Sequence, residues 1–303
     1  LGLNLLVGYA GQVSLGHAAL FGIGAYTTAI ICTRLNWFPT WLAILAGIIL
    51  AGLVGYAVGV PVLRLKSHYL AMATLGLGLI ASILFVELKG LTGGNEGILG
   101  IPALSVFGFE FDSDLKFYYA VWLIVLLIIL LTINLVHSRI GRAMRALHSS
   151  ETAADAMGID TSGYKIQVFV LSACLAGLGG SLFALYARYI DPGSFTFMFS
   201  ILFITMVVVG GMGNIWGGLL GALFLQFLPP FIKALPDWIP GIPASLTNFS
   251  NYELVVYGLL LMVFMIFMPR GIASGLSRGA GLALRGAKRL KDRMSARRYG
   301  GRR

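Results

Sequence analysis

The residues whose types and spacing suit chemistry are concentrated in a charged stretch, residues 138–160, between two of the longest apolar runs. Three arginines recur there at i, i+3 and i+6: Arg139, Arg142 and Arg145. Neither this stretch nor the rest of the sequence contains a recognisable catalytic motif, and the four histidines lie far apart in the sequence. The chemistry that the stretch predicts is therefore binding through charged groups, not catalysis.

The same stretch carries local signals for a helix of about two turns. Ser149 or Ser150 can cap the N-terminus of this helix, and Glu151 suits its first turn, where the helix dipole favours an acid. A second acid, Asp155, follows one turn later, and Gly158 can end the helix. Local sequence alone therefore predicts a short helix between two apolar runs.

Two interpretations of this helix are open. By the i, i+3, i+4 rule, Ala153, Ala154 and Met157 share one face and form a small apolar patch beside the charges, which suits docking against another protein. The alternative is a plain cytoplasmic connection, because short loops on that side of a membrane collect Lys and Arg whatever their function. The docking interpretation is favoured, since charge bias alone requires neither the small-residue face nor the terminal glycine.

The elements that must position this helix are apolar segments. Of the 303 residues, 58% are hydrophobic and 11% are charged, which excludes an ordinary soluble domain. The sequence therefore predicts an all-α, polytopic transmembrane helical bundle. A span needs about 20 mostly apolar residues, and eight segments qualify: residues 14–33, 41–63, 68–88, 116–138, 163–189, 199–212, 215–235 and 251–269. Because the chain begins within an apolar pattern at Leu1, a further N-terminal span is expected to precede it.

The net charge of +10 is confined to the C-terminal end. Residues 270–303 contain eleven Lys and Arg and one acid, whereas residues 1–269 contain eleven of each sign. In a soluble chain such a run suggests nucleic-acid binding, but directly after a hydrophobic segment it indicates a cytoplasmic tail that faces anionic membrane lipids. We therefore expect a transmembrane domain over residues 1–269 with a cytoplasmic loop at 138–162, a basic cytoplasmic tail over 270–303, and no nucleic-acid partner.

Polar residues also interrupt the first apolar stretch, residues 2–26, which is rich in glycine. These polar residues are Asn4, Gln12, Ser14 and His17. A lipid-facing helix would not carry so many groups that need partners. Either the small residues permit close helix packing, or the helix breaks near residues 11–14 and presents backbone groups to a water-filled path. His17 is expected to be a hydrogen-bonded structural group rather than a ligand.

Small residues recur in two later segments. A dense run between residues 172 and 181 predicts tight helix contacts, and the apolar segment after residue 199 breaks from Gly210 to Trp216. This second glycine-rich break resembles the first, which suggests an internal repeat with binding groups near the middle of the membrane. The predicted solute path is lined by Gln12, Ser14, His17, Thr74, Gly211 and Asn214.

The predicted spans contain no Asp, Glu or Lys in their central thirds, so the sequence lacks the proton relay of a secondary active transporter. Energy, if the chain uses any, must come from another protein. Two functions follow: the membrane subunit of an ATP-driven transporter, driven through the short helix around Ala154, or a passive channel that works alone. An integral membrane enzyme would need a cluster of polar groups that the sequence does not show.

Five motifs, in order along the chain, carry a resemblance to a known family. They read GLNLLVGYAGQVSLGHAALFGIGAY from residue 2, LRLKSHYLAMATL from 63, IGRAMRALHSSETAADAMGI from 140, VVVGGMGNIWGGLLGA from 207 and MPRGI from 268. Together they closely resemble the branched-chain amino acid ABC transporter permeases of the LivM type. The resemblance runs from Gly2 to about Ile272 and leaves only the basic tail outside it.

The resemblance implies an importer in a bacterial inner membrane. It would combine a second homologous permease chain, two cytoplasmic ATPase subunits that bind the ATP, and an external binding protein that delivers leucine, isoleucine or valine. The chain itself would hold no cofactor and no metal and would not be an enzyme. The family also includes urea, amide and other amino acid systems, so those solutes are the alternative.

The resemblance also implies which residues couple the chain to the ATPase. The short helix looks like the permease loop that docks in the ATPase groove. The residues implied in coupling are Arg142, Arg145, Glu151, Ala153, Ala154, Met157 and Gly158. The sequence departs from the general ABC permease pattern by one extra residue between the acid and the glycine.

Overall fold

The computed structural model describes residues 1–35, 38–63, 67–106, 109–238, 258, 262, 266 and 271–273. The chain divides into two compact units, Leu1–Val207 (unit 1) and Val208–Arg303 (unit 2). Most of the predicted segment 251–269 and of the basic tail 270–303 lies outside the described residues. The predicted tail therefore stays a prediction.

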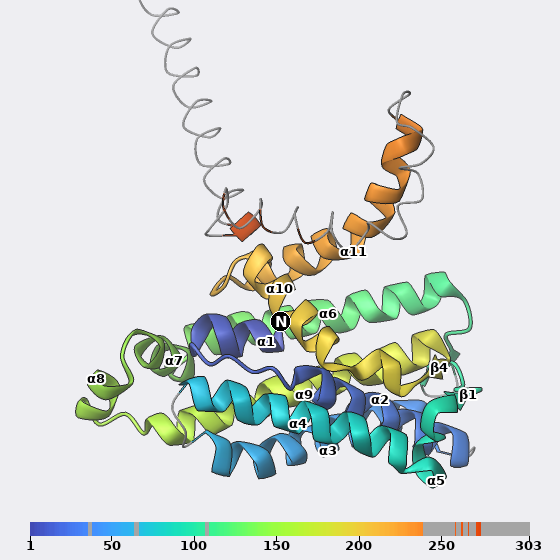
Figure 1. Ribbon diagram of the computed structural model, residues 1–303, viewed down its shortest axis with the longest axis horizontal. Coiled ribbons are helices and arrows are strands. Elements are labelled where there is room, and N and C mark those ends of the chain that lie inside the picture. Colours follow the sequence, from blue (N-terminus) through green and yellow to red (C-terminus); the bar gives the residue numbers. More distant parts are fainter. Residues whose placement is uncertain are drawn as a thin grey trace, which may run out of the picture. The chain divides into compact units, whose positions relative to one another are not determined.

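Unit 1 is built from helices joined by short connections (Figure 1). Its long helices are α2 (His17–Arg34), α3 (Thr40–Val62), α4 (Ser67–Glu87), α6 (Asp114–His137) and α9 (Thr161–Ala187). Its short helices are α1 (Gly2–Asn4), the π-helix η1 (Leu5–Tyr9), α5 (Lys89–Thr92), η2 (Gly94–Glu96), α7 (Arg139–Ser149), α8 (Glu151–Ala156) and η3 (Pro192–Phe195). Helix α10 (Phe197–Gly210) begins in unit 1, and α11 (Ile215–Trp238) lies in unit 2.

The centre of unit 1 is formed by α2, α3 and α9, which pack side by side (Figure 1). Small residues allow the backbones to approach closely. A Cβ added at Gly24 would lie 2.5 Å from the Cα of Gly177, and one added at Gly177 would lie 2.5 Å from the Cβ of Ala51. The tight contacts predicted from the small-residue run of α9 are therefore confirmed.

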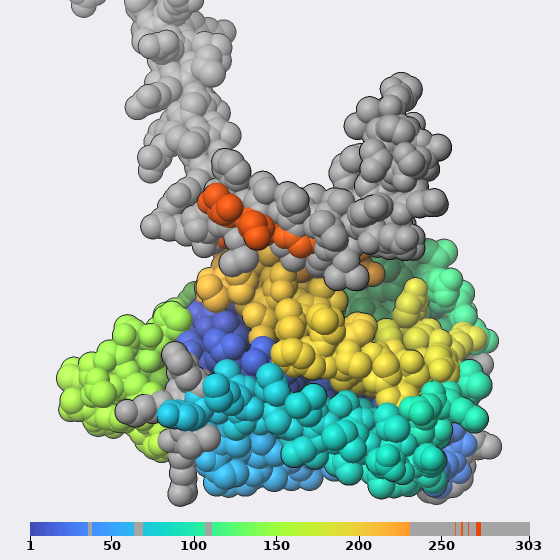
Figure 2. All heavy atoms as spheres, in the orientation of Figure 1, coloured from blue at the N-terminus to red at the C-terminus, as the bar shows by residue number. Residues whose placement is uncertain are grey.

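The two ends of unit 1 differ in character (Figure 1). At one end, the connection between α4 and α6 forms the short strands β1 (Ile98–Leu99), β2 (Ser105–Val106) and β3 (Phe109–Glu110). β1 pairs antiparallel with β4 (Tyr189–Ile190), which follows α9. At the other end, α7 and α8 form a lobe that Figure 2 shows in yellow-green. The predicted binding stretch therefore lies at the end opposite these strands.

The described residues contain four helices that are long and apolar enough to span a membrane: Thr40–Val62, Tyr69–Glu87, Asp114–His137 and Thr161–Ala187. The pair Phe197–Gly210 and Ile215–Pro230 adds a fifth span if it is counted as one bent element. The fold is thus an all-α, polytopic membrane bundle, but the eight predicted spans are not confirmed. Segment 14–33 corresponds to α2, which is not among these four helices. The polar residues His17 and Arg34 at its two ends lower its mean hydropathy. Segments 199–212 and 215–235 are the two arms of the bent pair.

Candidate functional site

The charged stretch, residues 138–160, begins with α7, an amphipathic helix that was not predicted. Ser138 caps it, because the Oγ of Ser138 accepts a hydrogen bond of 3.2 Å from the backbone N–H of Ile140. Its buried residues are Gly141, Ala143, Met144 and Leu147, whereas Arg139, Arg142 and Arg145 are exposed. The signal was present, since Ile140, Ala143, Met144 and Leu147 follow the i, i+3, i+4, i+7 pattern of a buried helix face.

The predicted short helix is confirmed as α8. Ser150 rather than Ser149 is its cap: the Oγ of Ser150 accepts from the N–H of Ala153 at 3.3 Å, whereas Ser149 ends α7. Glu151 occupies the first turn. The chain leaves the helix through Gly158, whose φ of +78° lies in the left-handed region that suits glycine.

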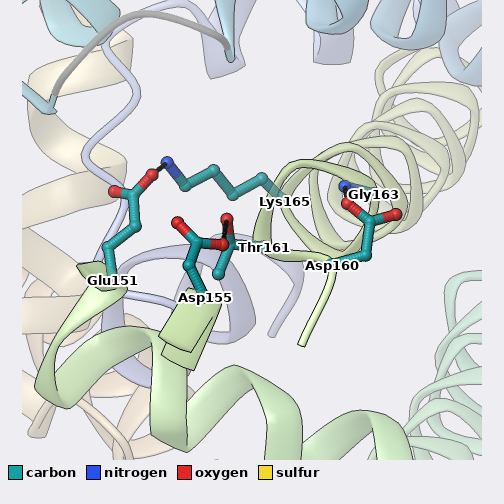
Figure 3. A network of polar contacts seen from close by, with 6 residues as sticks. All are labelled: Glu151, Asp155, Asp160, Thr161, Gly163 and Lys165. Atoms are coloured by element: carbon teal, nitrogen blue, oxygen red, sulfur yellow. Dashed lines mark hydrogen bonds and ion pairs between the residues drawn. The ribbon is translucent and has the colours of Figure 1, made fainter. Parts of the chain in front are cut away.

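The inner face of α8 is held against the start of α9 (Figure 3). Lys165 of α9 forms an ion pair with Glu151, and the Oγ1 of Thr161 donates to Oδ1 of Asp155 at 2.6 Å. Ala154 lies between these two acids on the helix and is only 3% exposed. The carboxylates of α8 therefore fix the helix on the chain's own scaffold.

The outer face of α8 differs from the predicted patch. Ala153, Ala156 and Met157 are exposed, Met157 by 83%, whereas Ala154 is buried. Ala154 therefore does not belong to the exposed patch that was predicted, and the docking role of the helix stays a prediction. Counting i+3 and i+4 from Ala153 gives Ala156 and Met157, so the exposed face could be derived from spacing, but Ala156 was missed.

A groove of about 530 Å³ lies between α7 and the connection from α8 to α9, and it is lined by both basic and acidic side chains. Its lining residues are Arg139, Arg142, Ala143, Gly158, Ile159, Asp160 and Tyr164. Asp160 caps α9 through a 3.0 Å hydrogen bond from the N–H of Gly163 (Figure 3). Arg142 and Gly158, both predicted to couple the chain to a partner, thus share one groove, and the exposed Arg145 is not part of its lining.

The first glycine-rich stretch forms a broken helix. η1 ends at Tyr9 and α2 begins at His17, and Gly11 between them has a φ of +67°. The backbone N–H of Leu15 donates to the Oγ1 of Thr74 in α4 at 3.0 Å. A Cβ added at Gly16 would clash with the carbonyl oxygen of the same threonine. The helix therefore breaks where predicted and the break packs closely against α4, whereas the water-filled path stays a prediction.

His17 is a hydrogen-bonded structural group within this break. Its Nδ1 lies 2.9 Å from the Oγ of Ser14, and its Nε2 lies 2.7 Å from the Oγ of Ser172 in α9. The ring also packs edge-on against Phe169, with 6.1 Å between ring centroids. Both ring nitrogens are engaged inside the protein, so the structural interpretation of His17 is supported and Ser172 is its partner.

The predicted path residues of unit 1 come together at this break. Ser14, His17 and Thr74 are buried and hydrogen-bonded. Gln12 is 4% exposed, and neither side-chain polar atom of Gln12 has a hydrogen-bond partner among the described residues. Buried amides normally have hydrogen-bond partners, so Gln12 is an exception among the described residues.

The remaining path residues form the second break, within unit 2. Gly211 and Gly213 have φ values of +114° and +74°, and the Oδ1 of Asn214 accepts from the N–H of Trp216 at 3.1 Å at the start of α11. The helices on either side are bent by 119°. The predicted break from Gly210 to Trp216 is thus confirmed as a sharp bend whose conformation depends on glycine.

Comparison with known proteins gives a consistent picture. Residues 1–265 match the family model described as branched-chain amino acid transport system / permease component. The high-affinity branched-chain amino acid transport system permease protein LivM of Salmonella typhimurium is 33% identical over 90% of the chain, and LivM of Escherichia coli is 32% identical over the same share. LivH of Salmonella typhimurium is 27% identical over 90% of the chain and 89% of its own length.

The match to the LivM proteins is partial in one respect. The chain spans 66% of the length of each of the two LivM relatives. No solved structure matches the chain.

Proposed function

The chain belongs to the family of branched-chain amino acid transport system permease components, and from this we propose that it is the membrane-spanning permease subunit of an ATP-driven importer. Its solutes are leucine, isoleucine and valine, delivered by an external binding protein. It works with a second homologous permease chain and two cytoplasmic ATPase subunits. Similarity to both LivM and LivH proteins supports the paired arrangement.

The single observation that carries the proposal is the construction of α8. Its inner face is fixed to α9 by Glu151 and Asp155, and its outer face exposes Ala153, Ala156 and Met157. A short helix that is anchored on one side and exposes an apolar face on the other is suited to dock in a groove of a partner. We assign this outer face to the ATPase groove, with Arg142 and Arg145 beside it.

The positions of charged residues support the proposed orientation. The arginines of α7 lie at the opposite end of unit 1 from the strands β1 and β4 (Figure 1). Because cytoplasmic connections collect Lys and Arg, we assign the α7–α8 end and the basic tail to the cytoplasm of a bacterial cell, with the spans in its inner membrane.

The two glycine-rich breaks supply the proposed path. A break frees backbone groups that an unbroken helix would use internally, and half-helix N-termini favour a carboxylate. ATP hydrolysis in the partner subunits would move α8, and the breaks would alternate access to the two sides. The chain binds no ATP and needs no cofactor in this scheme.

The test is solute uptake by the complete complex in proteoliposomes. The proposal predicts uptake of labelled leucine that requires ATP, the ATPase subunits and the external binding protein. Leucine flux in vesicles that contain only this chain and no ATP would establish a passive channel instead. Uptake of urea or an amide in place of aliphatic amino acids would correct the solute while leaving the importer intact.

A further inference from the structure

The groove between α7 and the connection from α8 to α9 lies where two apolar helices end. Helix α6 ends at His137 and leads through Ser138 into α7, and α9 begins at Thr161 (Figure 1). Both α6 and α9 are long and apolar enough to span a membrane. The volume of the groove, about 530 Å³, is within the range of about 300–1,000 Å³ that is usual for ligand sites. The groove can therefore hold a small molecule or the head group of a lipid.

The exposed aromatic residues of α6 indicate the level of this groove relative to a membrane. Tyr118, Tyr119 and Trp122 are exposed near the start of α6, and Tyr and Trp concentrate at membrane–water interfaces. At a rise of about 1.5 Å per residue, the helix from Tyr119 to His137 is about 27 Å long. This length is close to the hydrocarbon thickness of a bilayer, about 30 Å. The opposite interface therefore lies near His137, where the groove is.

The surface of α6 between these two levels is apolar. Its exposed large side chains are all leucines: Leu123, Leu126, Leu127, Leu130 and Leu131. Exposed leucines along a span are the surface that lipid chains cover. Lipid molecules whose chains lie against α6 would thus have their head groups near the groove.

The groove presents two arginines at this level. Arg139 and Arg142 are exposed, lie one turn apart on α7 and line the groove. Within the described ranges, neither guanidinium forms an ion pair with a carboxylate. Nη1 of Arg142 donates to the backbone carbonyl oxygen of His137 at 3.4 Å. Because a guanidinium carries five N–H donors, both side chains retain donors for a ligand.

The other polar groups of the lining leave the groove with a net positive charge. Asp160 is the acid of the lining, and its Oδ1 accepts from the N–H of Gly163 at the N-terminus of α9, where the helix dipole stabilises a carboxylate. Tyr164 is half-buried and carries a hydroxyl that can donate to an oxygen anion. Two guanidinium groups and a phenol suit a phosphate ester, which arginine binds with paired N–H donors.

We propose that this groove binds the head group of an anionic phospholipid, with Arg139 and Arg142 on the phosphate and the acyl chains along α6. Basic pockets beside transmembrane helices on the cytoplasmic side bind such head groups. A soluble phosphate ester shares this chemistry, but the level of the groove at the membrane surface favours the lipid. The inference rests on the proposed function only in assigning this end of the chain to the cytoplasm.

The test measures binding of phosphatidylglycerol to the purified complex by native mass spectrometry, without ATP or leucine. Arg139→Gln should weaken binding about fivefold, the contribution of one arginine near an anionic membrane surface. The matched control is Arg145→Gln, because Arg145 is exposed on the same helix and is not among the residues that line the groove. The basic tail is unchanged in both variants, so their difference reports on the groove. Equal binding by the two variants would overturn the proposal.

A substitution at Asp160 should act in the opposite direction. Asp160→Asn removes the negative charge from the groove, whereas asparagine keeps the cap of α9 because it is as good an N-cap as aspartate. We expect phosphatidylglycerol to bind several-fold more tightly, at an unchanged unfolding temperature. Unchanged or weaker binding in a folded variant would contradict a phosphate site.

Two further ligands identify the source of the phosphate. Phosphatidylcholine with the same acyl chains should bind less tightly than phosphatidylglycerol, since its choline offsets the charge of the phosphate. Glycerol phosphate, which has no acyl chains, should not displace the lipid. Displacement at a concentration equal to that of the lipid would assign the groove to a soluble phosphate ester and overturn the lipid site.

Uptake and lipid binding are separate measurements, so the two proposals can fail separately. A complex that takes up leucine with ATP but shows no effect of Arg139→Gln on lipid binding refutes only the lipid site. A complex that binds phosphatidylglycerol through Arg139 but shows no ATP-dependent uptake refutes only the proposed function.

Discussion

His17 makes two buried side-chain hydrogen bonds, although it lies in an apolar stretch. It joins the break to α9 through Ser14 and Ser172, at 2.9 and 2.7 Å. Replacing His17 by alanine leaves two buried hydroxyls without their partner, which should destabilise the protein by about 2 kcal/mol. Thermal unfolding of the purified chain in detergent measures this loss. His137→Ala, at an exposed position at the end of α6, is the matched control and should change the unfolding temperature little.

A second experiment on His17 separates its structural role from a role as a solute ligand. In complexes that remain folded, His17→Asn should keep the concentration dependence of leucine uptake, because asparagine can retain one of the two hydrogen bonds. A large change in the half-saturating leucine concentration, at an unchanged unfolding temperature, would show that the imidazole contacts the solute.

Single glycines decide how closely the helices of unit 1 pack. Gly24→Ala would place a methyl group against the backbone of Gly177, where no side chain can move aside. We expect destabilisation on the order of 3 kcal/mol. Gly76→Ala in α4 is the control, because an added Cβ there meets nothing within 4 Å. The control should be neutral or slightly stabilising, and equal unfolding temperatures for both variants would argue against the α2–α9 crossing.

At the scale of elements, the two faces of α8 make opposite predictions. Ala156→Arg changes only the exposed outer face, so it should weaken association with the ATPase subunits while leaving the unfolding temperature of the chain unchanged. Ala154→Leu inserts volume into the buried inner face and should lower the unfolding temperature by overpacking. Copurification of the ATPase subunits and thermal unfolding, measured on both variants, distinguish the faces. Loss of association with Ala154→Leu at full stability would reverse the assignment.

The arginines of α7 provide a related prediction. Arg142 and Arg145 are exposed, and Arg142 lines the groove between α7 and the connection from α8 to α9. Reversing both charges to glutamate should uncouple ATP hydrolysis from leucine uptake without destabilising the chain, because neither guanidinium is part of the buried face of α7. Unchanged uptake with both residues altered would count against a docking role for this element.

Helix α8 also shows which structural features can be predicted from the sequence and which cannot. Ser150 and Gly158 act on their immediate neighbours, so the helix and its ends were predictable. The direction that the helix faces depends on the ion pair of Glu151 with Lys165, fourteen residues further along the chain, and Ala154 lies on the buried face. The hydrogen bond between His17 and Ser172 joins residues that are 155 positions apart. No local pattern specifies such tertiary contacts.

At the scale of the whole molecule, the difference between local sequence signals and tertiary structure explains which features of the spans were predictable. Composition predicted an all-α membrane bundle correctly, because the hydropathy of a segment reflects whether lipid or water surrounds it. The number of spans was less predictable, since segments 199–212 and 215–235 are similar in hydropathy to two spans but are arms of one bent pair. The glycine-rich breaks were predictable because positive φ values at Gly11, Gly211 and Gly213 require glycine.

The central claim is that this chain moves solute only when an ATPase acts on α8. It is tested most directly by measuring leucine uptake into proteoliposomes that contain the full complex, with ATP and external binding protein, for the parent and for Ala156→Arg. The account predicts ATP-dependent uptake for the parent and a loss of uptake for the variant at unchanged chain stability. Uptake by the parent without ATP, or full ATP-driven uptake by the variant, would contradict it.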